Sequence, residues 1–174
     1  MQKQLSFLPK IALEHGGEVR RGKRKITRPI DPKRPLHVVL RAPRARGKWS
    51  MLHARHRKKV EVLVQQSSRK FGVRVYRCAN VGNHLHLLVQ TRRRRDFQNF
   101  LRFLTGSIAF AITGTRKGRP IGRFWEKLAY SRIVSWGREF ETVTTYFIKN
   151  LFEAAGFPEI RAPGAKVIRL RLRP

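Results

Sequence analysis

The sequence predicts an α+β fold, an antiparallel-rich sheet with its helices packed on one face. Three observations carry this prediction. The chain has 174 residues, enough for one domain with a hydrophobic core. Its apolar residues alternate in some segments and recur at helical spacing in others. These segments follow in the order strand, helix, strand, strand, helix, strand, helix, which is typical of helices covering one side of a sheet. We therefore expect the other face to be open to a ligand.

Four segments are predicted to be β-strands, because they are rich in apolar and β-branched residues and are bounded by turn residues. Gly82 and Asn83 supply the turn chemistry between the second and third strands, so these two should form a hairpin. The strands are expected at residues 36–41, 73–81, 84–90 and 129–134.

Three segments are predicted to be helices, since their apolar residues fall on one stripe. Gly72 ends the first helix, and Gly156 with Pro158 ends the third. Asp96 begins the second helix and suits the helix dipole. The helices are expected at residues 53–71, 96–113 and 138–155.

Composition divides the chain into three parts. Residues 1–34 are rich in Lys and Arg with little periodicity, and are expected to form a basic, largely extended N-terminal arm. Residues 35–156 form the predicted compact domain. Residues 157–174 form a basic C-terminal tail whose alternating apolar and basic residues fit either an edge strand or an arm that orders on DNA.

The charge balance indicates a polyanionic partner. Against 10 Asp and Glu stand 40 Lys and Arg, a net charge of +30 at pH 7. Such a chain repels itself unless nucleic acid or counterions offset the charge. A solvated basic face, as in a ribosomal or chromatin protein, is the alternative that charge alone leaves open.

Cysteine content and hydropathy exclude several classes of protein. Cys78 is the only cysteine, which excludes an intramolecular disulfide and a multi-cysteine zinc site. The apolar stretches are too short to span a membrane, and no secretory signal is evident. We expect a cytoplasmic protein without a membrane partner.

His84 and His86 are the first candidate site residues. Side chains alternate between the faces of a strand, so both imidazoles and Leu88 should point one way while Leu85 and Leu87 point the other. A metal ion could then take a neutral nitrogen from each ring. Two histidines at this spacing also occur by chance, and a structural hydrogen-bonding role is the alternative.

Tyr146 is the second candidate. It lies beside Phe147 on the flank of the apolar stripe of the last helix, and Asn150 follows four residues later. This spacing puts the tyrosine hydroxyl and the amide of Asn150 on the same side of the helix. The alternative is an aromatic packing residue followed by an unrelated polar one.

Four ordered segments resemble the HUH single-tyrosine transposases, and in particular the branch called REP-associated tyrosine transposases. The resemblance covers roughly residues 35–156, and the ordered set is more specific than any one segment. The segments are His37-Val38-Val39-Leu40-Arg41, Asn83-His84-Leu85-His86-Leu87-Leu88-Val89, Phe124-Trp125-Glu126 with Tyr130-Ser131-Arg132-Ile133-Val134, and Thr145-Tyr146-Phe147-Ile148-Lys149-Asn150.

This resemblance implies a single HUH domain of ferredoxin-like architecture that acts on single-stranded or hairpin DNA as a monomer or homodimer. It also implies a bacterial-type protein associated with the nucleoid. Tyr146 would attack a phosphodiester, form a 5′-phosphotyrosine link and release a 3′-hydroxyl, and a later attack by a 3′-hydroxyl would rejoin strands. It also implies Mg²⁺ or Mn²⁺ held by His84 and His86. The third ligand of relatives is commonly a Gln, and the shorter Asn150 stands in its place.

Two further points qualify the comparison. Val81-Gly82 stands where the family usually has Met-Pro, and Gly remains compatible with a turn. Tyr130 is the rival nucleophile, but its position in a strand beside Arg132 favours a structural or DNA-facing role.

DNA contacts are expected from cations that lie beside aromatic residues or follow the histidine strand, a pairing suited to single strands. Solvated charge runs and a core tryptophan are the alternative. The expected DNA-contacting residues are His37, Arg41, Arg92, Arg93, Arg94, Arg95, Arg116, Lys117, Arg119, Arg123, Trp125, Arg132 and Lys149.

Two alternative functions remain open at this point. They are a non-catalytic nucleic-acid-binding protein and an RNA-structural protein.

Overall fold

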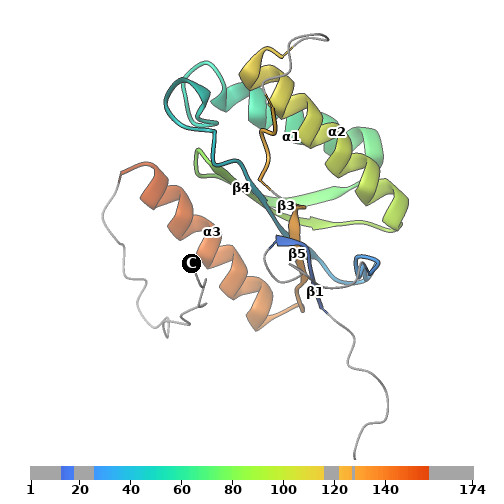
Figure 1. Ribbon diagram of the computed structural model, residues 1–174. Coiled ribbons are helices and arrows are strands. Elements are labelled where there is room, and N and C mark those ends of the chain that lie inside the picture. Colours follow the sequence, from blue (N-terminus) through green and yellow to red (C-terminus); the bar gives the residue numbers. More distant parts are fainter. Residues whose placement is uncertain (1–12, 18–25, 116–121, 127, 157–174) are drawn as a thin grey trace, which may run out of the picture.

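The computed structural model describes residues 13–17, 26–115, 122–126 and 128–156. Within them lie three α-helices and an antiparallel sheet of five strands in the spatial order β1-β5-β2-β4-β3 (Figure 1). The predicted α+β class is confirmed. The strands are β1 (Glu14–His15), β2 (Leu36–Arg41), β3 (Arg74–Asn80), β4 (His84–Gln90) and β5 (Tyr130–Ile133), and the helices are α1 (Arg57–Phe71), α2 (Arg94–Thr113) and α3 (Arg138–Ala154).

The predicted segments agree closely with the observed ones. β2 and β4 have the predicted bounds, and β3, β5 and α3 differ by one residue at one or both ends. α1 begins only at Arg57 because the residues from His53 to His56 form turns. α2 begins at Arg94, two residues early, because the extended backbone ends at Arg93. None of the described helices is long and apolar enough to cross a membrane.

The helices occupy both faces of the sheet. α1 and α2 cover one face, and α3 lies across the other (Figure 1). The expectation that all helices share one face is therefore wrong for α3. The physical reason is that the second face is itself partly apolar: Leu88 and Ala79 point to it and are fully buried beneath α3.

The larger core lies between the sheet and the first two helices. Alternate residues of β2 and β4 point into it, as the period of two predicts. Phe97 and Phe100 of α2 are fully buried there. Its strand residues are Leu36, Val38, Leu40, Leu85, Leu87, Val89 and Ile133, and α1 and α2 contribute Val60, Val64, Phe97, Phe100, Leu104, Ile108 and Ile112.

A smaller core fixes α3 on the second face. Val143 and Phe147 of the helix pack on Ala79, Leu88 and Val134. This packing buries one side of the helix and brings its neighbouring residues over β4, the strand that carries the paired histidines.

The turn before β4 is held by buried polar contacts. The amide of Asn80 donates to the carbonyl of Met51 at 2.8 Å, and its oxygen accepts the backbone N–H of Gly82 at 3.0 Å. Gly82 has a φ of 88°, and a Cβ there would lie 2.9 Å from the hydroxyl of Ser50, so the turn favours glycine. The start of the histidine strand is thereby fixed.

The described parts of the predicted N-terminal arm belong to the folded body. β1 pairs with β5. Arg28 is buried, donates to the hydroxyl of Ser131 and to the carbonyl of Ala129, and lies 5.7 Å from the ring centre of Phe97. Desolvation lowers the pKa of Arg28 to about 10. A strand of two residues shows no readable alternation, which is why composition indicated only a basic arm.

Replacing Asn80 by Ala should lower the free energy of unfolding by roughly 2 to 3 kcal/mol, because a buried carbonyl and a buried N–H lose their partner. Urea denaturation followed by circular dichroism measures this change. Gln98→Ala on the exposed face of α2 is the control and should cost less than about 0.5 kcal/mol. Equal midpoints for the two variants would contradict this role for Asn80.

Candidate active site

The two histidines of β4 lie side by side on the face that α3 covers. The ring centres of His84 and His86 are 6.1 Å apart, with an interplanar angle of 18°. Their Cα partners in β2 are Arg41 and Val39. Strand alternation thus gives the arrangement that the spacing predicts.

A third imidazole, that of His37 on β2, extends the row. Its ring is stacked on His86 with centres 5.7 Å apart, and its Nε2 lies 3.4 Å from Nδ1 of His86. Only 8% of His37 is exposed, so the structure puts this predicted DNA contact in the floor of the site. The sequence did not reveal the row, because it depends on the register between β2 and β4.

Tyr146 comes over the same row from α3. Its ring centre is 5.7 Å from that of His86 and 6.2 Å from that of His37, edge-on to both. Phe147 packs beside it, 5.3 Å from His37 and 5.9 Å from His86. The fold therefore brings the half-buried tyrosine and the histidines into one site, although 60 residues separate His86 from Tyr146 in the numbering.

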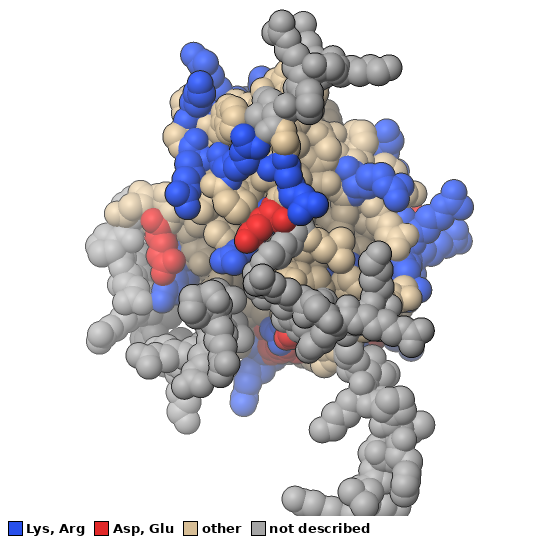
Figure 2. Space-filling view, in the orientation of Figure 1, with Lys and Arg blue, Asp and Glu red and all other residues tan. Residues whose placement is uncertain are grey.

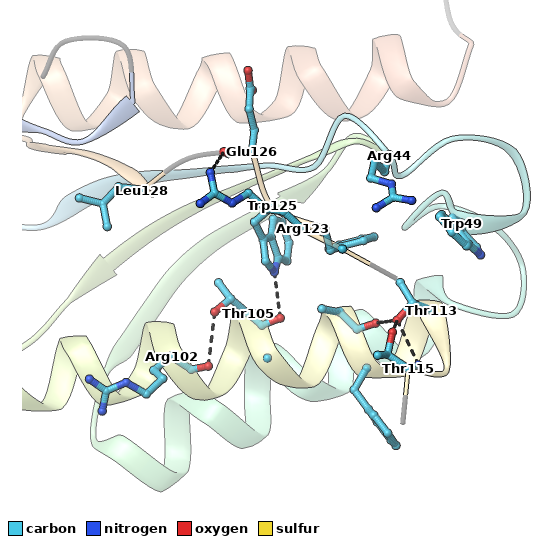
Figure 3. A pocket seen from close by; sticks show the side chains of 15 residues that line it. Arg44, Trp49, Arg102, Thr105, Thr113, Thr115, Arg123, Trp125, Glu126 and Leu128 are labelled. Atoms are coloured by element: carbon cyan, nitrogen blue, oxygen red, sulfur yellow. Dashed lines mark hydrogen bonds between the residues drawn. The ribbon is translucent and has the colours of Figure 1, made fainter. Parts of the chain in front are cut away.

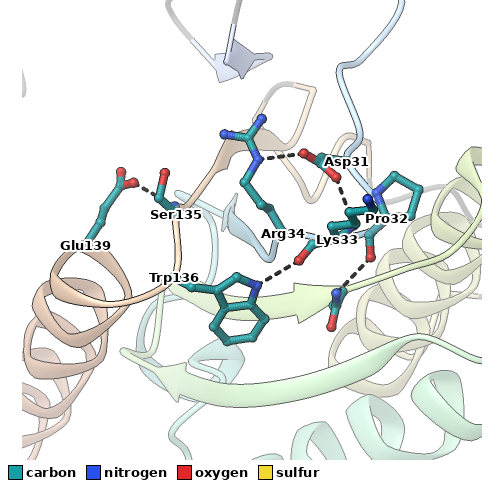
Figure 4. Close-up of polar contacts among 8 residues, drawn as sticks. Asp31, Pro32, Lys33, Arg34, Ser135, Trp136 and Glu139 are labelled. Atoms are coloured by element: carbon teal, nitrogen blue, oxygen red, sulfur yellow. Dashed lines mark hydrogen bonds and ion pairs between the residues drawn. The ribbon is translucent and has the colours of Figure 1, made fainter.

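The first turn of α3 is anchored to the segment that precedes it. The carboxylate of Glu139 accepts one hydrogen bond from the guanidinium of Arg132 at 2.5 Å and another from the backbone N–H of Ser135 at 2.7 Å. The indole of Trp136 donates to the carbonyl of Lys33 at 2.7 Å (Figure 4). The helix that carries Tyr146 is thus fixed at its start as well as along its buried stripe.

Asn150 lies on the buried side of α3. It is 9% exposed, and its amide nitrogen has no hydrogen-bond partner within the described part of the chain. A buried amide without a partner is costly. A hydrogen-bond acceptor next to this nitrogen, such as a phosphate oxygen, would remove that cost.

The three imidazoles are held in the neutral form. Burial lowers the pKa of His86 to about 3, and the neighbouring His37, His84 and Arg41 add to the effect. Burial and then Arg132 lower the pKa of His37 to about 4. Burial and then Arg41 lower the pKa of His84, against a smaller opposing effect of Glu126. Neutral rings are the form in which histidine binds metals.

The side chains at this site could supply some, but not all, of the ligands of a divalent metal ion. Within the described ranges, no group of three or more His, Cys, Asp or Glu could hold a metal ion. The candidate metal ligands are two adjacent neutral imidazoles and the side-chain oxygen of the buried Asn150. A divalent metal bound there would need further oxygen ligands, which water and a phosphodiester can supply.

Tyr130 of β5 is poorly suited to be the nucleophile. Burial and then Glu14, by charge and by a hydrogen bond, raise the pKa of its hydroxyl, while Arg132 opposes them weakly. Its ring touches His37 edge-on at 6.5 Å. The structural role expected from its strand position agrees with these surroundings.

The predicted DNA-contacting cations fall into different surroundings. Arg41 lies beside His84, whereas Arg132 pairs with Glu139 and Lys149 lies 3.7 Å from Glu153. The exposed run 92–95 follows the C-terminal end of β4, whereas His84 begins this strand. The two ends of the strand are about 20 Å apart. Basic side chains with few acids among them are spread over the face in Figure 2.

Trp125 and Arg123 line an open groove of about 680 Å³ between α2 and the segment before β5 (Figure 3). The indole of Trp125 donates to the carbonyl of Thr105 at 2.9 Å and packs on the larger core, as the core-tryptophan alternative expects. Glu126 points away from the groove toward the side of α3 (Figure 3). The predicted contacts Arg116, Lys117 and Arg119 lie outside the described residues.

Comparisons with known proteins identify the family and a similar fold. The sequence model of the family described as "Transposase IS200 like" matches residues 34–150. No curated protein sequence matches the chain. Among solved structures, the chain is similar to a REP-associated tyrosine transposase bound to a REP hairpin, with 11% identity, coverage of 78% of this chain and 80% of that one, and a TM-score of 0.58. A crystal structure of a proposed transposase from Deinococcus radiodurans R1 has 11% identity, coverage of 67% and 89%, and a TM-score of 0.43.

The lowered histidine pKa values predict a pH dependence of stability. The folded rings of His37 and His86 stay neutral down to about 4 and about 3, whereas the unfolded chain takes up protons below 6.5. The unfolded state therefore binds more protons in this window, and the free energy of unfolding should fall as the pH is lowered through it. Urea titrations at several pH values measure this, and His86→Asn should weaken the dependence. NMR signals assigned to His37 or His86 that titrate near pH 6.5 in the folded protein would contradict the assignment.

Proposed function

The chain belongs to the IS200-like transposase family, and from this premise we propose that it is a metal-dependent transesterase that cleaves and rejoins single-stranded DNA through a 5′-phosphotyrosine link. The observation that carries the proposal is the seating of the Tyr146 ring, 5.7 Å from the ring centre of His86, against a row of neutral imidazoles.

In the proposed reaction, the phenol oxygen of Tyr146 forms a bond to phosphorus as the bond to the 3′-oxygen of the preceding nucleotide breaks. The phenol proton ends on the released 3′-hydroxyl, so a phosphodiester replaces a phosphodiester. Attack by a DNA 3′-hydroxyl on the phosphotyrosine reverses the exchange and joins strands. No external energy source enters the balance.

His84, His86 and the amide oxygen of Asn150 are the proposed ligands of Mg²⁺ or Mn²⁺. When bound, the metal supplies Lewis-acid polarisation of the non-bridging phosphate oxygens and orients the scissile bond. The neutral rings of the two histidines support this assignment, and Asn150 enters it because its side chain lies buried on the same side of α3 as Tyr146. The structure of the similar REP-associated transposase with a REP hairpin supports hairpin-forming repeats as the substrate.

The net charge of +30 at pH 7 gives the proposed substrate its affinity, because phosphate contacts by Lys and Arg release counterions. The exposed run 92–95 is too far from His84 to act on the scissile phosphate. We assign it to DNA several nucleotides away, and we expect the protein to work in the cytoplasm, where DNA is accessible.

A non-catalytic nucleic-acid-binding protein is the second candidate. The observation that favours it is the absence, among the described residues, of a metal-binding group of three or more His, Cys, Asp or Glu. Tight, salt-sensitive DNA binding without any covalent product distinguishes it from the first candidate.

The nucleophile can be identified because the chain has only three tyrosines, Tyr76, Tyr130 and Tyr146. With a single-stranded hairpin oligonucleotide and Mn²⁺, the wild type should form a covalent adduct that denaturing gel electrophoresis resolves. The double variant Tyr76→Phe, Tyr130→Phe should still form it, and Tyr146→Phe should not. An adduct with Tyr146→Phe at wild-type yield would refute the nucleophile assignment.

Removing the metal site should separate chemistry from binding. His86→Ala, or EDTA with the wild type, should lower the rate of adduct formation by roughly 100-fold or more. The dissociation constant for the hairpin should rise by no more than about 10-fold, because phosphate contacts supply most of the affinity and any coupling to the metal adds a smaller share. Unchanged adduct formation in EDTA would exclude the metal from the mechanism.

A further inference from the structure

Both ring nitrogens of His84 already have partners. The Nε–H of Arg41 lies 2.6 Å from Nε2 of His84, and Nδ1 lies 2.7 Å from the side-chain oxygen of Asn83. A guanidinium is only a donor, so Nε2 must be the acceptor. The proton of the neutral ring therefore sits on Nδ1 and is donated to Asn83. These contacts define one tautomer.

In this tautomer, Arg41 blocks the nitrogen of His84 that could bind a metal. The only lone pair that the neutral ring can offer is on Nε2, and this lone pair already accepts the hydrogen bond from the Arg41 guanidinium. The guanidinium also adds a positive charge where a divalent cation would bind. A metal can bind His84 only after Arg41 has moved away.

We propose that Arg41 makes metal binding at His84 depend on DNA: a backbone phosphodiester takes over the guanidinium and thereby frees Nε2 for the metal. This inference rests on the proposed function and deepens it. Metal and DNA would then bind cooperatively, and the site would stay incomplete until a strand arrives.

A phosphodiester is well suited to take the guanidinium. It is anionic and accepts two parallel N–H bonds from arginine, whereas an imidazole is neutral and accepts one. Arg41 is exposed at the end of β2, where a strand that reaches Tyr146 and His84 would also meet it. The exchange therefore replaces a weak contact by a stronger one.

The chain also provides an acid on this side of the sheet. The backbone N–H of Glu126 donates to the carbonyl of Arg41 at 2.9 Å, and the Glu126 side chain points to the side of α3 (Figure 3). If this carboxylate took the guanidinium instead of DNA, metal binding would need no DNA. The experiment below separates the two cases.

Coupling between metal and DNA is best measured by Mn²⁺ electron paramagnetic resonance in the Tyr146→Phe background, where no cleavage is expected. We expect the hairpin to tighten Mn²⁺ binding roughly 3- to 10-fold, the range for one exposed charged hydrogen bond. Mn²⁺ held by DNA alone is measured with His84→Ala and subtracted. This readout does not depend on activity.

The matched variants are Arg41→Gln and Arg132→Gln. Both remove one positive charge from the histidine face, but Arg132 donates to Glu139 and not to an imidazole. Arg41→Gln should tighten Mn²⁺ binding without DNA by roughly 3- to 10-fold and reduce the effect of DNA to less than about 2-fold. Arg132→Gln should preserve the effect of DNA.

Three results would overturn the proposal: equal Mn²⁺ affinity with and without the hairpin, identical behaviour of the two variants, or no Mn²⁺ binding at all. Failure of the proposed function has a different signature, namely the lack of a covalent adduct on the wild-type protein. Circular dichroism confirms that each variant is folded, and exposure of Arg41 makes a folding defect unexpected.

Discussion

The site depends on the packing of α3 against the histidine face of the sheet. Phe147 and Val143 fill a small apolar area formed by Leu88 and its neighbours, and this contact brings the tyrosine of α3 to the histidines of β4. Burial of Phe147 stabilises the helix position and also desolvates His37 and His86. One packing interaction therefore sets both the geometry and the protonation state of the site.

The excess of basic residues acts at two ranges. Over the whole surface it provides attraction for a polyanion. Close to the site, Arg41 and Arg132 oppose protonation of the imidazoles. Burial is the main reason that the histidine rings stay neutral, and the same charge that attracts DNA adds to this effect. In the coupling that we propose, this charge also disfavours a metal until a DNA phosphate offsets it.

The sequence predicted much of this arrangement, and what it missed has physical causes. Alternation within β4 determines that His84 and His86 share a face, and helical spacing determines that Tyr146 and Asn150 share a side. Neither pattern says which face of a sheet a helix covers, so α3 was expected on the wrong one, although Leu88 on the histidine face was an available signal. The inclusion of His37 and the bond from Arg41 to His84 depend on strand register, which no local pattern encodes.

Whether Tyr146 and the histidine pair form one catalytic site is best decided by identifying the residue that is modified after reaction. Wild-type protein would react with the hairpin oligonucleotide and Mn²⁺, be digested with nuclease and protease, and be analysed by mass spectrometry. We expect a phosphotyrosyl nucleotide on the peptide that contains Tyr146. Modification of Tyr130 or Tyr76 instead, or of no tyrosine, would contradict it.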